Sequence, residues 1–203
     1  MRSVPPLVLV TDRHATSGRT LVDVVAAALD AGLPAVQLRE KDLPGRPLLA
    51  LAEQLRALTA RVGALFLVND RIDVAVAAGA DGVHLGGGSL PVGVARRLLA
   101  AGALIGVSTH APVEAAATEA DFAFFGPVYS TPAKAGYGAP QGPTRLRQAA
   151  AAARVPLLAI GGITAARIPA VRAAGAAGVA VIRAILAAED PGSATRALLD
   201  GLA

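Results

Sequence analysis

Two positively charged side chains stand two positions apart in the segment Gln-Leu-Arg-Glu-Lys-Asp at residues 37–42. Arg39 and Lys41 would point to the same side of an extended segment, because alternate side chains of an extended chain share a face. A guanidinium and an ammonium group together can hold a pyrophosphate whose negative charge grows as it leaves. The segment therefore predicts stabilisation of a departing diphosphate.

The segment Asn-Asp-Arg at residues 69–71 offers two oxygen ligands. Asn69 and Asp70 carry the amide and carboxylate oxygens that a hard divalent cation takes. The same three residues could equally cap a helix and form a local ion pair. Both interpretations stay open at the level of the residues.

Lysine is rare in this chain and marks two segments. Of the 19 residues that are Lys or Arg, only Lys41 and Lys134 are lysines. Lys134 lies within residues 126–142, which contain four glycines and three prolines. A segment of this length and composition predicts a flap that closes over a substrate and excludes water, with a disordered surface excursion as the alternative.

The other reactive side chains exclude several kinds of chemistry. His14, His84 and His110 have no metal-binding spacing, and no Ser-His-Asp or Cys-His arrangement emerges from the order of the residues. The chain has no cysteine, which rules out disulfide bonds and thiolate metal sites. Hydrolysis through a covalent nucleophile is therefore not expected.

The elements that must position these residues repeat along the chain. Short apolar runs without clean alternation are typical of buried parallel strands, and helical stretches such as 48–61, 95–101 and 144–153 separate them. Glycines that end helices precede several of these runs, as in Ala-Gly-Leu-Pro at 31–34. The predicted strands are residues 7–10, 35–38, 65–68, 82–85, 104–107, 122–125, 156–160 and 178–182.

Eight strands that alternate with helices over residues 1–203 predict an α/β fold, a single (β/α)₈ TIM-barrel domain with parallel strands. A doubly wound open sheet is the main alternative, but it would normally carry a glycine-rich first turn, and residues 11–14 read Thr-Asp-Arg-His. Chemistry in a TIM barrel belongs to residues that follow the strands. Gly161 and Gly162 follow the seventh predicted strand and Arg183 the eighth, where this fold commonly binds phosphate.

The composition limits the partners and the location. Hydrophobic residues make up 54% of the chain and charged residues 17%, which excludes a disordered protein. The net charge is +4, but the basic residues are scattered and aromatic residues make up only 3%, so nucleic-acid binding is not expected. We see neither a membrane-spanning stretch nor a signal peptide. We expect a cytoplasmic protein that binds small phosphorylated molecules, and the sequence leaves open whether it forms a homo-oligomer.

Taken in order, the strand tips resemble those of thiamine phosphate synthase, within the superfamily that also contains the thiazole tautomerases. The resemblance covers nearly the whole chain, and its specificity lies in the ordered set of motifs rather than in any one of them. These motifs are Leu-Val-Thr-Asp at 9–12, Gln-Leu-Arg-Glu-Lys-Asp at 37–42, Asn-Asp-Arg-Ile-Asp at 69–73, Ala-Gly-Ala-Asp-Gly-Val-His-Leu-Gly at 78–86, Gly-Val-Ser-Thr-His at 106–110, Gly-Pro-Val-Tyr-Ser-Thr at 126–131 and Ala-Ile-Gly-Gly-Ile-Thr at 159–164.

The resemblance implies a transferase of thiamine biosynthesis. An aminopyrimidine pyrophosphate would ionise to a stabilised carbocation and pyrophosphate, and the nitrogen of a thiazole phosphate would capture the cation. Arg39, Lys41 and Lys134 would hold the pyrophosphate, and Ser108 would hydrogen-bond near the reacting centre. The protein would act by stabilising developing charge.

The resemblance also implies a bound Mg²⁺ ion and a set of binding residues. Asp70 would bind the metal with Asn69, and Ser89 is a second candidate ligand. Gln37 and His84 would line the pyrimidine pocket, and the Gly161-Gly162 turn and the amides near Ile182 would take the thiazole phosphate. The implied substrate-binding residues are Gln37, Asn69, His84, Thr131, Gly161, Gly162 and Ile182.

The sequence departs from the synthase pattern at several positions. Where the synthases have Gln-Glu-Asp, whose aspartate is a second Mg²⁺ ligand, this chain has Gly-Gly-Ser at 87–89. Removing that carboxylate should weaken metal binding unless water or pyrophosphate replaces it. Ala133 and Arg183 replace a threonine and a serine of the pattern, and Phe124-Phe125 is bulkier than the usual residues before Gly-Pro.

Two alternative functions follow from these departures. The segment Gly-Ser-Leu at 88–90 and the pair Phe125-Gly126 are similar to the thiazole tautomerases, which isomerise a thiazole carboxylate phosphate. The histidine that follows Phe-Gly in that pattern is Pro127 here. The second alternative is a non-catalytic protein that kept the phosphate-ligand pocket without turnover. The intact Arg39, Lys41, Asn69 and Asp70 favour the synthase.

Overall fold

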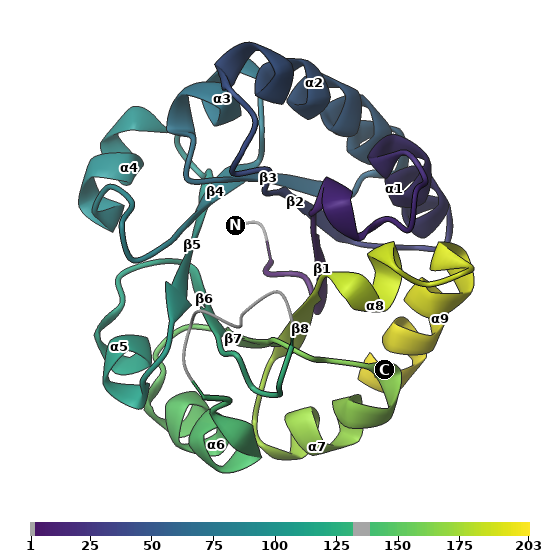
Figure 1. Cartoon of the computed structure of the whole chain (residues 1–203). Helices are drawn as coiled ribbons and strands as arrows, with labels where there is room; N and C mark the ends of the chain where they lie inside the picture. The colour runs from purple at the N-terminus through teal and green to yellow at the C-terminus, as the bar shows by residue number, and fades with distance from the viewer. Residues whose placement is uncertain (1–2, 132–138) are drawn as a thin grey trace.

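The strands form a ring at the centre of the molecule. The computed structural model describes residues 3–131 and 139–203, and in it eight parallel strands pair in chain order, with β8 closing onto β1 (Figure 1). The strands are β1 (Leu7–Val10), β2 (Ala35–Leu38), β3 (Leu65–Asn69), β4 (Gly82–Leu85), β5 (Leu104–Thr109), β6 (Phe122–Phe125), β7 (Leu157–Ile160) and β8 (Gly178–Val181). The barrel prediction is therefore confirmed, and closure excludes the open doubly wound sheet.

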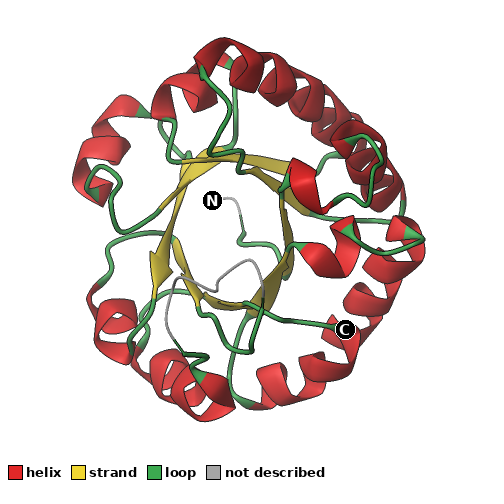
Figure 2. Ribbon diagram, viewed as in Figure 1, coloured by secondary structure: helices red, strands yellow, loops and turns green. Residues whose placement is uncertain are grey.

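Helices surround this ring on its outer side (Figure 2). Each strand is connected to the next through a helical segment, which returns the chain to the same end of the barrel. These segments are η1 (Arg13–Ala15), α1 (Leu21–Asp30), α2 (Gly45–Val62), α3 (Ile72–Ala77), α4 (Val92–Leu98), α5 (Pro112–Ala117), α6 (Gly142–Ala152), η3 (Ala165–Arg167), α7 (Ile168–Ala173), α8 (Arg183–Leu186) and α9 (Pro191–Leu202).

The strands are buried on both faces, which explains why their sequences are apolar without alternation. In β1, Leu7 and Leu9 pack outward against the helices, whereas Val8 and Val10 belong to the cluster inside the barrel. Phe122 and Phe124 fill the same interior from β6. Both sets of side chains exclude water, so each strand needs hydrophobic residues at nearly every position.

Some element boundaries differ from those predicted. The helix expected at 95–101 is α4 at Val92–Leu98, because Leu99 is already extended and Gly102 has φ +82°. Gly93 weakens the helical pattern of the true first turn. β5 runs two residues further than expected, so Ser108 lies within the strand, opposite Phe124 of β6. No helix in residues 3–131 or 139–203 is long and apolar enough to span a membrane.

Candidate active site

A small cavity lies at the carboxyl ends of the strands, inside the barrel mouth. Its volume is about 30 Å³, and six predicted site residues line it. β2, β3, β4 and β5 contribute one side chain each, and the segments after β2 and β8 contribute two more. These residues are Gln37, Asn69, His84, Ser108, Arg39 and Ile182. We call this space the mouth cavity.

The amide of Gln37 is the most informative polar group in the mouth cavity. Its Nε2 donates a hydrogen bond to Asn69 Oδ1 at 3.1 Å, which leaves Oε1 facing away from that bond. Gln37 is only 1% exposed, and Oε1 accepts no hydrogen bond from the described residues. A buried acceptor without a donor costs about 1–3 kcal/mol, so this position favours a ligand that brings an N–H group.

His84 forms one wall of the mouth cavity. Its ring packs on Phe124 with a centroid distance of 4.2 Å, and its centroid lies 6.0 Å from that of Phe122. The bulky Phe124, which departs from the synthase pattern, therefore packs against the imidazole ring. A flat aromatic wall of this kind can stack against a planar heterocycle.

Arg39 and Lys41 line two neighbouring cavities rather than one. Arg39 faces the mouth cavity, while Lys41 lines a second cavity of about 260 Å³ together with Asn69 and Asp70. Asn69 belongs to the walls of both cavities. The two cations therefore line adjacent cavities that share Asn69, and an extended diphosphate could reach both.

Asp70 stands in a backbone conformation that is uncommon for its residue type. Its φ is +64°, in the left-handed region, at the end of β3. Such conformations persist where the surroundings require them, and they are frequent at functional sites. Arg71 pairs with Asp73 through bonds of 2.8 and 2.5 Å, which lowers the pKa of the Asp73 carboxyl. The local ion pair expected as the alternative thus forms without Asp70.

The potential metal ligands near Asp70 are few. Ser89 Oγ accepts a hydrogen bond of 2.7 Å from the backbone N–H of Gly86, within its own turn. Within residues 3–131 and 139–203, no group of three or more His, Asp or Glu side chains could hold a metal. Asp70 and Asn69 supply one carboxylate and one amide oxygen. This set fits Mg²⁺ held jointly with substrate phosphates, since Mg²⁺ commonly uses one or two carboxylates in such sites.

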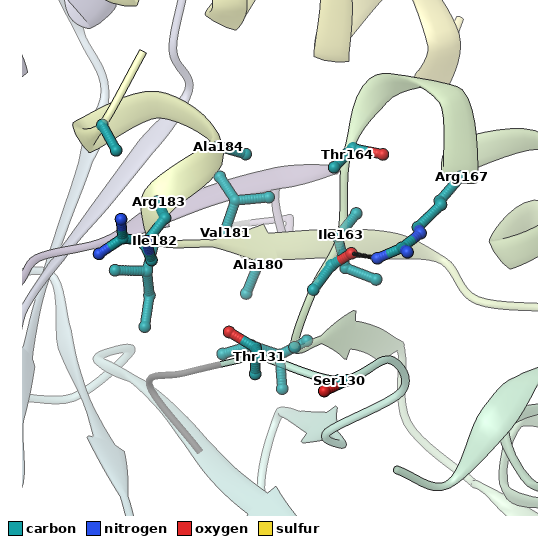
Figure 3. Close-up of a pocket in the computed structure, with 14 residues that line it drawn as sticks. Ser130, Thr131, Ile163, Thr164, Arg167, Ala180, Val181, Ile182, Arg183 and Ala184 are labelled. Carbon is teal, nitrogen blue, oxygen red and sulfur yellow. Dashed lines mark hydrogen bonds between the residues drawn. The ribbon is translucent and has the colours of Figure 1, made fainter. Parts of the chain in front are cut away.

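A larger pocket opens beside the mouth cavity, after β7 and β8 (Figure 3). Its volume is about 350 Å³, and it shares Ile160 and Ile182 with the mouth cavity. Thr131 lines it as well, together with Gly161 and Gly162. A short helix, α8, begins immediately after Ile182, as in the recurrent phosphate site of this fold. We call this space the phosphate pocket.

The glycine turn of the phosphate pocket has a geometry that other residues could not adopt. Gly161 and Gly162 have φ of +98° and +62°. A Cβ on Gly161 would lie 2.6 Å from Pro127 Cβ, and one on Gly162 would lie 2.7 Å from Ser130 O. Backbone hydrogen bonds from Val128 N to Ile160 O and from Tyr129 N to Gly161 O join the two segments. The start of residues 126–142 is thus packed on the turn.

Two arginines of the phosphate pocket were not predicted as site residues. Arg167 donates a hydrogen bond to Gly162 O (Figure 3). Its guanidinium carbon lies 4.4 Å from the centre of the Tyr129 ring. Arg183 lines the same pocket, and its side chain forms no hydrogen bond or ion pair with the described residues. The sequence signal for Arg183 was its place after the eighth strand. Arg167 comes later, on η3, and nothing in the local sequence marks it.

Two sequence predictions cannot be placed. Lys134 and Ala133 lie outside the described residues. Pro127 is buried at the position where the tautomerase pattern has a histidine, so this chain has no titratable group there.

Comparisons with known proteins agree with this geometry. The chain matches the family model described as thiamine monophosphate synthase over residues 7–185. A relative from Geobacter sulfurreducens is 56% identical over 196 residues, which cover 95% of this chain and 92% of that protein. The thiamine-phosphate synthase of Methanoculleus marisnigri is 49% identical, with coverages of 97% and 95%.

A solved structure shares both the fold and much of the sequence. The thiamine phosphate pyrophosphorylase from Pyrococcus furiosus superposes with a TM-score of 0.87 at 36% identity, covering 97% of this chain and 94% of that chain. The barrel, the cavities at its mouth and the match over residues 7–185 lead to one assignment. The chain belongs to the thiamine monophosphate synthase family of transferases.

Proposed function

We propose that this enzyme joins an aminopyrimidine pyrophosphate to a thiazole phosphate and releases pyrophosphate, giving thiamine phosphate. The observation that carries the proposal is the shared wall of the mouth cavity and the phosphate pocket, at Ile160 and Ile182. Two reactants bound in these spaces would meet at that wall. Gln37 Oε1 would accept a hydrogen bond from the amino group of the pyrimidine.

The reaction needs a leaving group that departs with its electron pair. The bond between the pyrimidine methylene carbon and the pyrophosphate oxygen breaks, and the thiazole nitrogen then donates its lone pair to that carbon. Arg39 and Lys41 would stabilise the charge that develops on the pyrophosphate, and Lys134 would complete this set. Ser108, on β5, would hydrogen-bond near the reacting centre.

Asp70 and Asn69 would hold a Mg²⁺ ion, and Ser89 is a further candidate ligand. When bound, it would neutralise part of the charge on the pyrophosphate. Because Asp70 is the single carboxylate among the proposed ligands, we expect the protein to bind Mg²⁺ far more tightly with pyrophosphate than alone.

We further propose that residues 1–203 act as one domain in the cytoplasm. The phosphorylated substrates carry charges that prevent passive passage through a membrane, so the enzyme and its substrates would share a compartment. Whether two or more copies assemble is left to a measurement of molecular mass in solution.

The direct test mixes the purified chain with both substrates and Mg²⁺ and measures thiamine phosphate. We expect a product peak that requires all three additions. No product at high enzyme concentration would overturn the synthase proposal. Saturable binding of the ligands without turnover would then indicate the non-catalytic alternative.

The tautomerase alternative has its own test. The chain is incubated with thiazole carboxylate phosphate alone, and isomerisation is followed by NMR. We expect no isomerisation above the uncatalysed rate, because Pro127 offers no acid or base at the expected position.

Substitutions at Lys41 and Asp70 test the site directly. Lys41→Ala and Asp70→Asn should each reduce turnover about 100-fold, the scale for losing one group that stabilises developing charge. Asn is chosen at position 70 because it tolerates the left-handed conformation. Thermal stability should change little, since both side chains are exposed.

The matched control is Asp30→Asn. Asp30 is an exposed carboxylate that pairs with Arg61 on the outer helices. This variant should keep wild-type turnover. Full activity of Lys41→Ala and Asp70→Asn would show that these strand tips are ordinary surface.

A further inference from the structure

Two carboxylates alternate with the two cations after β2. Glu40 and Asp42 stand next to Arg39 and Lys41 in the chain. Unpaired carboxylates at these positions would repel a pyrophosphate, because like charges within several ångströms interact strongly near a protein surface. Binding of pyrophosphate at this segment therefore requires a positive group that compensates the charges of Glu40 and Asp42.

Arg13, from η1, contacts both carboxylates. Its Nη1 and Nη2 each lie 2.6 Å from an oxygen of Asp42, in a two-pronged pair. Its Nη1 also donates to Glu40 Oε2 at 3.2 Å, and its backbone N–H lies within 3.2 Å of both Glu40 oxygens. One guanidinium thus bridges both carboxylates, a geometry to which the planar fork of arginine is suited.

The environment of the two carboxylates agrees with this pairing. Glu40 is only 5% exposed, so its carboxyl group depends on Arg13 for compensation. Asp42 is more exposed, and the imidazole Nε2 of His14 lies 3.0 Å from its Oδ2. The hydrogen bonds from Arg13, and then that of His14, hold the pKa of the Asp42 carboxyl well below its ordinary value.

The end of β1, next to Arg13, also holds the backbone of residues 37–42, which carry Arg39 and Lys41. Arg39 N–H donates to Thr11 Oγ1 at 2.8 Å, and Thr11 N–H donates to Gln37 O at 2.9 Å. Thr11 is fully buried. The end of β1 and η1 therefore hold the segment that follows β2, from which Arg39 lines the mouth cavity and Lys41 lines the second cavity together with Glu40.

We propose that Arg13 is a positioning residue that neutralises Glu40 and Asp42, so that a pyrophosphate bound beside Arg39 and Lys41 meets less uncompensated negative charge. This inference rests on the proposed pyrophosphate site. Arg13 acts through the carboxylates and needs no contact with the ligand. Its loss would expose the pyrophosphate to uncompensated negative charge.

The test measures the affinity of the full chain for inorganic pyrophosphate with Mg²⁺ by titration calorimetry. Arg13→Gln should weaken binding about tenfold, the effect of one uncompensated charge at this range. Asp42→Asn removes the negative charge and breaks the two-pronged pair, because an amide has only one oxygen acceptor for Arg13, so under charge compensation it should bind pyrophosphate as tightly as wild type or more tightly. Arg61→Gln, which breaks only the exposed pair with Asp30, is the matched control and should behave as wild type.

The two variants should change the affinity for pyrophosphate in different directions, and this difference distinguishes charge compensation from a purely structural role of Arg13. If Arg13 only braced the segment, breaking the pair from either side would weaken binding. Weaker binding in both Arg13→Gln and Asp42→Asn, or wild-type binding in Arg13→Gln, would overturn the proposal. Arg13→Lys keeps the charge and should recover most of the affinity, and it replaces Arg13→Gln if that variant does not fold.

Turnover provides a second readout. Arg13→Gln should raise KM for the pyrimidine pyrophosphate and leave KM for the thiazole phosphate unchanged. A wild-type chain that binds pyrophosphate but makes no thiamine phosphate would refute the proposed reaction, while the calorimetric comparison would still decide the role of Arg13. A wild-type chain that binds no pyrophosphate would refute the role of Arg13.

Discussion

Side chains from distant parts of the sequence gather at the barrel mouth in an order that parallel strands impose. Gln37, Asn69 and His84 come from successive strands; Asn69 lies opposite His84, and Gln37 lies opposite Leu67, two positions before Asn69. The carboxyl ends of these strands converge, so their identity as site residues could be predicted from their place in the chain. Ser108 joins them from within β5.

Arg183 is the residue of the phosphate pocket with the clearest individual test. It is exposed, and its side chain forms no hydrogen bond or ion pair with the described residues, so we expect it to bind the phosphate of the thiazole substrate. Arg183→Ala should raise KM for thiazole phosphate about tenfold, since a hydrogen bond to a charged group is worth about 1.5–3 kcal/mol. Steady-state kinetics with varied thiazole phosphate give this value.

The control for Arg183 is Arg97→Ala on α4. Arg97 is also exposed, and it donates a hydrogen bond only to Gly93 O of its own helix. Both variants should keep the wild-type melting temperature. An unchanged KM in Arg183→Ala would show that the arginine does not reach the ligand.

At the scale of elements, the segment after β6 and the turn after β7 form one packed unit. Residues 127–130 continue the pairing of β6 with β7, and Gln141 N and Gly142 N donate to Pro127 O and Val128 O. Both described ends of residues 126–142 are therefore tied to each other and to the phosphate pocket. Arg167 adds a further link between Tyr129 and Gly162.

The glycine turn makes this unit sensitive to one methyl group. Gly161→Ala would place a Cβ 2.6 Å from Pro127 Cβ at φ +98°, so it should lower the free energy of unfolding. We expect a loss of at least about 1–3 kcal/mol, the scale for one strained backbone conformation. Chemical denaturation of both proteins measures the difference.

Gly93→Ala provides the comparison for this substitution. A Cβ on Gly93 would meet no atom within 4 Å, and the residue lies in α4. This change should stabilise the protein by about 0.5–1 kcal/mol, the usual gain of Ala over Gly in a helix. Equal stability of the two variants would contradict the packing of the turn.

At the scale of the whole molecule, the barrel depends on the seam between its first and last strands. β8 pairs with β1 from Leu7 opposite Val179 to Leu9 opposite Val181, and Val179 N donates to Pro6 O at 2.8 Å. Gly178 stands at the start of this seam, where the backbones approach closely. The chain must bring these two strands together from its two ends.

Gly178→Ala should weaken closure of the barrel. The added Cβ would lie 2.4 Å from Pro6 O, which is a backbone atom that cannot turn away. We expect a fall of several degrees in the midpoint of thermal unfolding, followed by circular dichroism. Gly87→Ala, where a Cβ meets nothing within 4 Å, should keep the wild-type midpoint. An unchanged midpoint in Gly178→Ala would contradict the tight seam.

The sequence by itself determined the barrel architecture and the end of the barrel at which its polar residues gather. Apolar runs, helix-ending glycines and polar tips depend on each segment's own preference for burial or exposure, so they can be seen without the fold. The positions of Arg39 and Lys41 after β2 and of the glycine pair after β7 followed directly from that pattern.

Only the tertiary structure decided which cavity each of these side chains lines and which other side chains it contacts. It placed Arg39 and Lys41 in two cavities that share Asn69, joined Arg13 to Glu40 and Asp42, and packed Arg167 against the Tyr129 ring. Each of these contacts joins residues of different strand tips. Such distances are set by closure of the barrel, because they depend on the register of all its strands and on no local preference.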